Sequence, residues 1–189
     1  MSFIDTVRQI DYNIFSKLNG EWHNSFFDTL FPFIRESYIW LPFYFFLILF
    51  TTINFKERGW YWSVVFIITA SLSDFISSSI IKENFFRLRP CHDPLIADQV
   101  RFLVKYCPVS SSFVSSHAVN HFALAIYIFL TLKGISKWWA ACFSWAFLIS
   151  YAQVYVGVHF PADVVCGGLI GLLIGYLPAK LFNKKIGLV

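Results

Sequence analysis

Long apolar segments alternate with short polar connections along most of this chain. A helix that crosses the hydrocarbon core of a bilayer needs roughly 20 mostly apolar residues. Segments of about that length recur here, and few of their residues are charged. The pattern therefore predicts five membrane-spanning helices, at about residues 38–55, 59–81, 113–132, 138–156 and 162–182.

The N-terminal segment has a different pattern. Apolar residues recur at helical spacing between residues 2 and 18, but Asp5, Arg8 and Asp11 interrupt them. Such a segment is amphipathic, unlike the uninterrupted apolar region of a cleavable secretory signal. We predict that residues 1–35 form an interfacial helical segment. The part at residues 26–34 is expected to be either re-entrant or a sixth span.

The composition excludes an ordinary soluble domain. Of the 189 residues, 57% are hydrophobic and 14% are charged, whereas about 25% charged residues are usual in soluble domains. The formal net charge of +4 is modest and requires no nucleic-acid partner. We therefore predict an all-α fold over a single domain, residues 1–189. It is expected to be a polytopic transmembrane helix bundle of five to six spans with an amphipathic N-terminal helix.

Basic residues are dense in the short connections after the first and third predicted spans and in the C-terminal tail. Because short cytoplasmic connections carry an excess of Lys and Arg, these segments indicate the cytoplasmic side. The loop at residues 82–112 and the turn near His159 then face outward. We expect a multi-pass protein of the cell (inner) membrane whose polar site faces the periplasm or the cell exterior. The seven basic residues are Lys56, Arg58, Lys133, Lys137, Lys180, Lys184 and Lys185.

Three polar clusters adjoin the predicted spans on the outward side. They are Lys82–Pro90, Ser115–His117 and Gly157–Asp163. Because successive spans alternate in direction, all three clusters are expected at the same membrane face. Ionisable groups at membrane depth are costly and are usually functional. For each cluster taken singly, the alternative is a set of ordinary interfacial anchors.

The residue types in these clusters suit the hydrolysis of a phosphate ester. Phosphoryl transfer depends mainly on positioning and on neutralising the charge of the equatorial oxygens. Arg89 offers a planar fork for two oxygens, and Lys82 offers a point charge. Ser115 can donate its hydroxyl. The amides of Ser116 and His117 lie at a predicted helix start, where an anion is favoured.

The two histidines of these clusters can take opposite roles. Asp163 follows His159 by four residues, and it can orient the imidazole if a helix begins near Pro161. An oriented, neutral His159 is a candidate nucleophile, and His117 is a candidate acid for the leaving oxygen. The chain has neither a Walker-type glycine loop nor an HExxH zinc motif. We therefore expect neither a metal nor another cofactor.

Together the clusters resemble the motifs of the type 2 phosphatidic acid phosphatase superfamily. The family's first motif, Lys, six residues and Arg-Pro, matches in full at Lys82–Pro90. Its second motif, Pro-Ser-Gly-His, corresponds to Val114–His117, where the Ser and the His remain. Its third motif, Ser-Arg, five residues, His, three residues and Asp, corresponds to Ala152–Asp163, where the His and the Asp remain. The resemblance covers roughly residues 70–175.

The resemblance implies an integral membrane lipid phosphatase with a metal-independent phospho-histidine mechanism. Undecaprenyl diphosphate is the substrate that it favours, and phosphatidylglycerol phosphate, phosphatidic acid and lipid A phosphate are alternatives. The implied partners are the lipid phosphate and membrane lipids, with no nucleic acid, and the sequence indicates no oligomeric state. The resemblance assigns catalysis to His159, His117 and Asp163, and phosphate binding to Lys82, Arg89, Ser115, Ser116 and Gln153.

Gln153 departs from the family pattern, which has an arginine at this place. Glutamine keeps hydrogen bonding but lacks a fixed positive charge. Either another cation replaces the arginine, or the site suits a differently charged head group. A third interpretation, of another class, is a non-catalytic lipid-binding or transport protein that retains the fold. The candidate replacement cations are Arg87, His92, Arg101 and Lys105.

Three further features have two interpretations each. His121 lies one turn beyond His117, and it either touches the substrate or packs between helices. Cys91 and Cys107 lie in the outward loop and either form a disulfide or remain free thiols. Glycines recur every four residues in the span predicted at 162–182, where they permit close packing within the bundle or between two copies of the chain.

Overall fold

The computed structural model describes residues 3–188, and the side chains of residues 5–188. Within this part of the chain every element is helical, which confirms the all-α prediction. The apolar side chains at residues 3 and 4 of the predicted amphipathic face lie outside the described side chains. The α-helices are α1 (Phe3–Phe15), α2 (Ser25–Ile34), α3 (Leu41–Phe55), α4 (Glu57–Phe75), α5 (Lys82–Asn84), α6 (Ser116–Leu132), α7 (Ala141–Tyr155) and α8 (Pro161–Lys185).

Short helical segments extend or connect these helices. Two are π-helical and the others are 3₁₀ turns, and most of them continue directly into an α-helix. They are η1 (Ser16–Glu21), η2 (Ser37–Trp40), η3 (Ile76–Ile81), η4 (Pro90–His92), η5 (Ala97–Gln99) and η6 (Lys137–Ala140).

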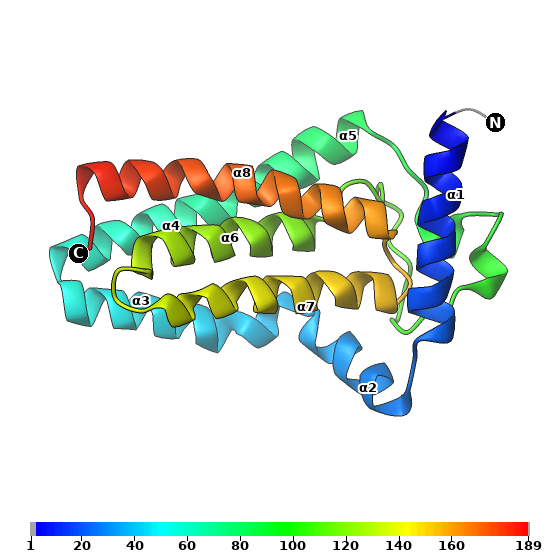
Figure 1. Ribbon diagram of the computed structural model, residues 1–189, viewed down its shortest axis with the longest axis horizontal. Helices are drawn as coiled ribbons and strands as arrows, with labels where there is room; N and C mark the ends of the chain where they lie inside the picture. Colours follow the sequence, from blue (N-terminus) through cyan, green and yellow to red (C-terminus); the bar gives the residue numbers. More distant parts are fainter. Residues whose placement is uncertain (1–2, 189) are drawn as a thin grey trace.

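The long helices lie side by side along the long axis of the molecule (Figure 1). Helices α6 and α8 approach each other closely, because Gly171 and Gly175 present bare backbone to α6. A Cβ atom at Gly171 would lie 2.3 Å from the carbonyl oxygen of Val119, and one at Gly175 would lie 2.1 Å from that of Ala123. These glycines therefore pack within the bundle, which is one of the two interpretations of their spacing.

Three helical runs among the described residues are long and apolar enough to cross a membrane: Ser37–Phe55, Glu57–Asn84 and Pro161–Lys185. Helix α6 is apolar but has 17 residues, and α7 has 15. Both are shorter than the spans predicted there. Helix α2 has 10 residues, which corresponds to about 15 Å of helix. This is half the thickness of a bilayer core, so α2 alone is too short to be a sixth span.

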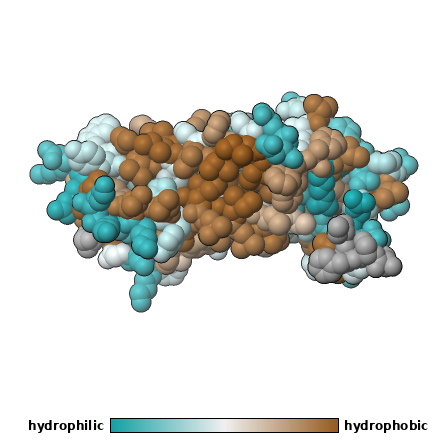
Figure 2. Space-filling model, turned by 90° about the horizontal axis from the view of Figure 1, so that it is seen from above, coloured by the Kyte–Doolittle hydropathy of each residue, from teal (hydrophilic) through white to brown (hydrophobic). Residues whose placement is uncertain are grey.

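Apolar surface gathers around the middle of the molecule, and polar surface lies toward its two ends (Figure 2). Large apolar side chains of α3, α4 and α8 contribute to the exposed surface; Phe45, Ile67 and Leu173, for example, are 62%, 53% and 74% exposed. Soluble monomers rarely expose a contiguous apolar area of this kind. The distribution matches a molecule whose middle is covered by lipid hydrocarbon.

The two ends of the bundle differ in what they carry (Figure 1). At one end, the α3–α4 and α6–α7 connections and the C-terminal segment lie together, and these contain the dense basic residues. At the other end, α1 and α2 lie beside the long α5–α6 loop and the α7–α8 turn. The three polar clusters of the sequence therefore share one end of the molecule, as predicted.

The α5–α6 loop is tied to itself and to α1. Cys91 and Cys107 form a disulfide with their Cα atoms 6.3 Å apart, so the structure contains the bridge rather than two free thiols. The Tyr12 hydroxyl of α1 donates a hydrogen bond to Asp93 in the loop. Within the loop, the Ser112 N–H donates to the Arg87 carbonyl at 2.8 Å. These ties hold the loop residues that face the α7–α8 turn.

Candidate active site

His159 lies in the turn between α7 and α8, and its side chain is buried. The turn closes because Gly157 adopts a left-handed conformation with φ of 85°, which glycine tolerates without a Cβ penalty. The N–H groups of Val158 and His159 then donate to the carbonyl of Gln153. Pro161 occupies the first turn of α8, where its fixed φ and missing N–H cost nothing. Local sequence therefore places the imidazole at the helix start.

Arg89 connects the loop cluster to His159. Its Nη1 atom lies 3.1 Å from Nε2 of His159 and donates to the carbonyl of Val158 at 3.0 Å. Its remaining nitrogens donate to the Ser110 carbonyl and hydroxyl and to the Ser111 carbonyl. Because a guanidinium can only donate, Nε2 of His159 accepts, and the imidazole proton resides on Nδ1. The lone pair of a candidate nucleophile is thus held on Nε2.

The Nδ1 side of His159 faces a carboxylate. Nδ1 lies 3.6 Å from Oδ2 of Asp163, which is too long for a direct hydrogen bond but close enough for electrostatic attraction. The Ser112 hydroxyl lies 3.4 Å from Nδ1 and donates to the same Oδ2 atom. The sequence interpretation that Asp163 orients His159 agrees with this geometry. The motifs did not point to Ser112.

Asp163 is itself fixed from two sides. Its Oδ2 accepts the backbone N–H of Phe160 at 2.9 Å, and its Oδ1 accepts Nη1 of Arg87 at 2.7 Å. Arg87 also pairs with Asp11 of α1 and lies over the ring of Phe160, with 4.1 Å from Cζ to the ring centroid. Arg87 therefore pairs with two carboxylates. It contacts the oxygen of Asp163 other than the one that faces His159.

Asp11 is a residue that the sequence reasoning missed. Its carboxylate pairs with Arg87, and it also accepts the backbone N–H of Ala162 at 2.8 Å in the first turn of α8. The available signal was the polar interruption of the apolar pattern in the N-terminal segment. Asp11 is buried, whereas Val7 and Ile10 of α1 are exposed. Helix α1 thus docks through both the Asp11 carboxylate and the aromatic rings of Tyr12 and Phe15, which pack on Phe160, while other apolar residues stay exposed.

The charge states of the two central groups follow from their surroundings. Burial lowers the pKa of His159 to about 4; the nearby Asp163 opposes this shift, and the charges of Arg89 and Lys82 add to it. Burial also lowers the pKa of Arg89 to about 10, which Asp163 opposes and Arg35 reinforces. At neutral pH the imidazole is therefore uncharged and the guanidinium remains charged.

Five buried donors lack a hydrogen-bond partner among the described residues, and three of them belong to predicted site residues: the hydroxyls of Ser115 and Ser116 and the Nε2 atom of Gln153. Unsatisfied buried polar atoms are rare and costly, so a cluster of them calls for an explanation. Backbone bonds bring these residues to the His159 turn. The Ser115 N–H donates to the carbonyl of Asp163, and His159 donates to the carbonyl of Gln153. These three donors are therefore free to bind a ligand.

Lys82 and His117 complete the set that the motifs predict. Lys82 begins α5 and lies close enough to His159 to influence its titration. His117 is in the first turn of α6, beside the unpartnered serines. Its ring stacks on that of His121, with 6.2 Å between centroids. The structure thus gathers all eight of the predicted catalytic and phosphate-binding residues at one end of the bundle.

The other candidate residues are engaged elsewhere. Arg101 pairs with both carboxylate oxygens of Asp28 at 2.8 Å. His92 is exposed and lies 3.4 Å from the sulfur of Cys107, and Lys105 is also exposed. Nδ1 of His121 donates to the His117 carbonyl of its own helix at 2.7 Å, and its ring packs on Trp145 at 4.9 Å. This geometry favours helix packing over substrate contact for His121.

One group of described residues, Cys91, His92 and Cys107, brings potential metal-ligand atoms within 4.8 Å of one another. Both sulfurs are already joined in the disulfide. They are therefore not available as thiolates, which are the form that binds a metal.

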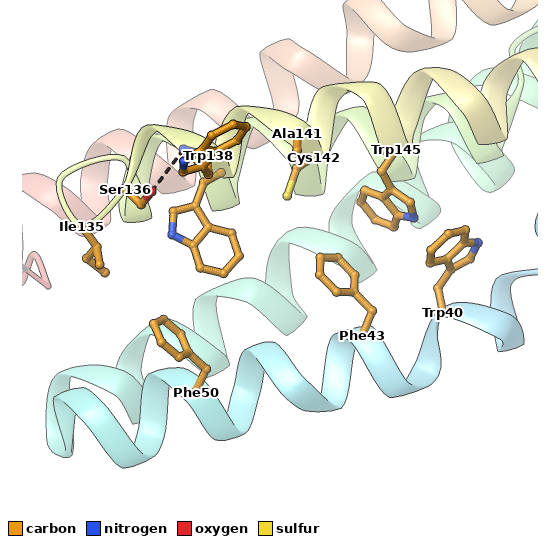
Figure 3. A pocket seen from close by; sticks show the side chains of 10 residues that line it. Trp40, Phe43, Phe50, Ile135, Ser136, Trp138, Ala141, Cys142 and Trp145 are labelled. Carbon is orange, nitrogen blue, oxygen red and sulfur yellow. Dashed lines mark hydrogen bonds between the residues drawn. The ribbon is translucent and has the colours of Figure 1, made fainter.

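An apolar groove runs along the bundle between α3 and α7 (Figure 3). Its volume is about 530 Å³, and its walls include Trp40, Phe43, Phe50 and Trp145. The Trp145 ring also contacts His121, which stacks on His117. One end of the groove therefore adjoins the helix that carries the site, and its length lies beside the apolar middle of the molecule.

Comparison with known proteins identifies a family. The model of the PAP2 superfamily matches residues 60–186. The lipid A 4'-phosphatase of Porphyromonas gingivalis is 29% identical over 95% of this chain and 75% of its own length. That of Bacteroides thetaiotaomicron is 32% identical over 92% of this chain and 77% of its own. The undecaprenyl-diphosphatase of Sulfolobus acidocaldarius is 29% identical over 94% and 77%.

A solved structure has the same architecture. The crystal structure of the first transmembrane PAP2 type phosphatidylglycerolphosphate phosphatase from Bacillus subtilis superimposes with a TM-score of 0.69. The match is 25% identical in sequence and covers 96% of this chain and 88% of that one. The arrangement of helices is therefore shared with a transmembrane phosphatase.

Proposed function

Because the chain belongs to the PAP2 superfamily and is a membrane lipid phosphatase, we propose that it works through a covalent phosphate on His159. The observation that carries this proposal is the pairing of Nε2 of His159 with Arg89, next to a group of unpartnered donors. A neutral imidazole with a fixed lone pair is a competent nucleophile. The adjacent donors suit the three oxygens of a transferring phosphoryl group.

The first step of the proposed reaction transfers the phosphoryl group to the protein. Nε2 of His159 forms a bond to phosphorus, the bond from phosphorus to the lipid oxygen breaks, and His117 donates a proton to that oxygen. Asp163 balances the positive charge that develops on the imidazole. Lys82, Arg89 and the unpartnered donors neutralise the phosphoryl oxygens. Arg89 moves its donation from Nε2 to the phosphate in this step.

The second step returns the protein to its starting state. A water molecule attacks phosphorus, His117 accepts a proton from that water, and the bond between Nε2 and phosphorus breaks. Inorganic phosphate leaves. His117 regains in this step the proton that it donated in the first step. Both steps use side chains of this chain for nucleophile, acid and charge neutralisation, so the proposed mechanism requires no metal.

For the substrate, we propose the phosphate monoester of a glycolipid of the lipid A type. Two relatives that are similar over nearly the whole chain carry the name lipid A 4'-phosphatase. Undecaprenyl diphosphate, which the motifs favoured, is the second candidate, and the Sulfolobus relative supports it. In either case the groove between α3 and α7 offers an apolar surface for the lipid tail beside the site.

The proposed topology has five spans: α3, the α4–α5 run, α6, α7 and α8. Helices α6 and α7 run alongside the longer helices, although they are shorter than the usual span (Figure 1). The N-terminal segment, residues 1–35, lies at the interface on the side of the site. We place this side at the periplasmic or outer face of the cell membrane, because the basic connections are at the opposite end. Residues 1–189 then form one lipid phosphatase domain.

A substrate panel tests this function. Release of inorganic phosphate is measured from lipid A, undecaprenyl diphosphate, phosphatidylglycerol phosphate and phosphatidic acid, with a chelator present. We expect highest kcat/KM on lipid A and a loss of about 10³-fold or more in His159→Ala, which lacks the nucleophile. The matched control is His23→Ala, which removes an exposed histidine outside the site.

Each contrary outcome rejects a different part of the proposed function. Activity that disappears with chelator contradicts the metal-independent mechanism. Activity retained by folded His159→Ala contradicts the nucleophile. Phosphate release from undecaprenyl diphosphate alone selects the second substrate. A folded wild-type protein that is silent on every lipid supports the non-catalytic lipid-binding alternative.

A further inference from the structure

We infer that Arg35, at the end of α2, supplies the cation that the third motif lacks at Gln153. The inference rests on the proposed function, because it names a phosphate-binding residue of the same site. Arg35 Nε donates to Oε1 of Gln153 at 3.3 Å. The charge is thus held beside the position where the family has its arginine, but it comes from a different part of the chain.

The backbone at the end of α2 fixes Arg35 in this place. The Arg35 N–H donates to the carbonyl of Phe31, and the indole of Trp40 donates to the carbonyl of Ile34 at 2.8 Å. The side chains of Phe31 and Ile34 are buried against α7 and the α7–α8 turn. A rigid, buried helix end therefore carries the guanidinium toward Gln153, and only 14% of the Arg35 side chain is exposed.

Arg35 stands among like charges. It lies near enough to lower the pKa of Arg89, as an additional effect after that of burial. It also lies within electrostatic range of His117. A buried guanidinium that approaches another guanidinium is unfavourable unless an anion joins them. An oxyanion that binds next to Arg35 and Arg89 would offset this repulsion.

The local bonds of Arg35 leave donors for a ligand. Nη1 donates to the carboxylate of Glu36 at 2.8 Å, and Nε donates to Oε1 of Gln153. Nη2 has no hydrogen-bond partner among the described residues. Glu36 is 41% exposed, so solvent weakens its hold on the charge. Gln153 uses its oxygen to orient Arg35 and keeps Nε2 unpartnered. The pair Arg35 and Gln153 thus presents two free donors where a single arginine would present its fork.

The test moves the arginine from position 35 to position 153. Arg35→Gln is expected to lower kcat/KM by about 10²-fold, the usual effect of losing one donor to transition-state charge. It should also raise the Kd for inorganic phosphate by about tenfold or more, because a hydrogen bond from a charged donor is lost. In Arg35→Gln/Gln153→Arg, the arginine returns at the motif position, and at least tenfold of the kcat/KM should be recovered. Arg58→Gln, an exposed arginine at the other end, is the matched control.

Phosphate binding by calorimetry on the detergent-solubilised full chain separates this inference from the proposed function. If wild type hydrolyses lipid phosphates and Arg35→Gln leaves kcat/KM and Kd unchanged, the inference is overturned and the function stands. If wild type is silent on every lipid but Arg35→Gln weakens phosphate binding, the function fails and the inference stands. Lost activity with unchanged phosphate binding and no recovery in the double variant overturns the inference, because Arg35 then only anchors α2.

A second variant serves if Arg35→Gln does not fold. Glu36→Gln keeps the guanidinium and frees its Nη1 atom. Arg35 as a phosphate ligand predicts a lower Kd for inorganic phosphate in this variant. A lower Tm with unchanged Kd would instead assign the Arg35–Glu36 pair to the stability of α2 and overturn the inference.

Discussion

At the scale of single residues, the protonation of His159 determines whether the site can act as proposed. Arg89 donates to Nε2, and the Ser112 hydroxyl and the Asp163 carboxylate face Nδ1. This arrangement selects one tautomer of the neutral ring. Burial favours the same neutral state, because it lowers the pKa of His159 to about 4.

The pH dependence of the reaction should show this shift. His159 loses its lone pair when it is protonated, so kcat/KM falls as pH drops through its pKa in the free protein. We expect the acid limb attributable to His159 near pH 4, not near the ordinary value of about 6.5. A kcat/KM profile measured between pH 3.5 and 8 checks this. An acid limb near pH 6.5 would indicate a solvated imidazole and contradict the buried geometry.

The motif residues could be predicted from the sequence, but several of their partners could not. Lys82, Arg89, His117, His159 and Asp163 are recognisable by type and spacing. Ser112 contacts His159 and Asp163 directly, Asp11 reaches Asp163 through Arg87, and Arg35 contacts Gln153 across a separation of 118 residues. No local pattern marks such contacts, because they arise only when distant elements pack together. Arg101, a candidate replacement cation in the outward loop, instead pairs with Asp28.

At the scale of elements, the close approach of α6 and α8 positions both halves of the site. Helix α6 carries His117 at its start, and α8 carries Asp163 at its start. The two starts are joined where the Ser115 N–H donates to the Asp163 carbonyl. The bare glycine face of α8 permits this approach along the length of the two helices.

Gly171→Val should therefore destabilise the bundle and displace the site. A Cβ atom there would lie 2.3 Å from the Val119 carbonyl oxygen, so the helices must separate. We expect a loss of about 1–3 kcal/mol in the free energy of unfolding, as for overpacked cores. Thermal unfolding in detergent and kcat/KM are measured together. Leu173→Val, at a position 74% exposed on the same helix, is the control. An unchanged Tm for Gly171→Val would show that the α6–α8 contact can relax at no cost.

At the scale of the whole molecule, an apolar middle separates a basic end from the end that holds the site (Figures 1 and 2). A lipid in the same bilayer can thus present its head group at one end while its tails remain beside the apolar helices. The α5–α6 loop covers this end, and it carries Arg87, Arg89 and Ser112. Its disulfide joins Cys91 to Cys107 and so shortens the connection between Arg89 and Ser112.

Removal of the disulfide should weaken both stability and activity. The bridge closes a loop with a sequence separation of 16 residues, for which chain entropy gives about 3 kcal/mol as an upper value. In Cys91→Ser/Cys107→Ser we expect a lower Tm and a lower kcat/KM, because Arg87 and Arg89 are held less firmly. Cys166→Ala, at a free cysteine, is the control. Mass spectrometry of protein purified without reductant checks the bridge; two free thiols in the wild type would contradict it.

The sequence by itself determined the all-α class, the membrane location, the family and the candidate residues of the site. These follow from apolar segment length and from short motifs, which are local properties of the chain. Tertiary structure alone decided which groups surround those residues. It placed Arg35 beside Gln153, Asp11 and Arg87 behind Asp163, and glycines of α8 against α6. The physical reason is that charge, burial and close approach depend on which helices pack together, and residues far apart in the chain meet only in the folded bundle.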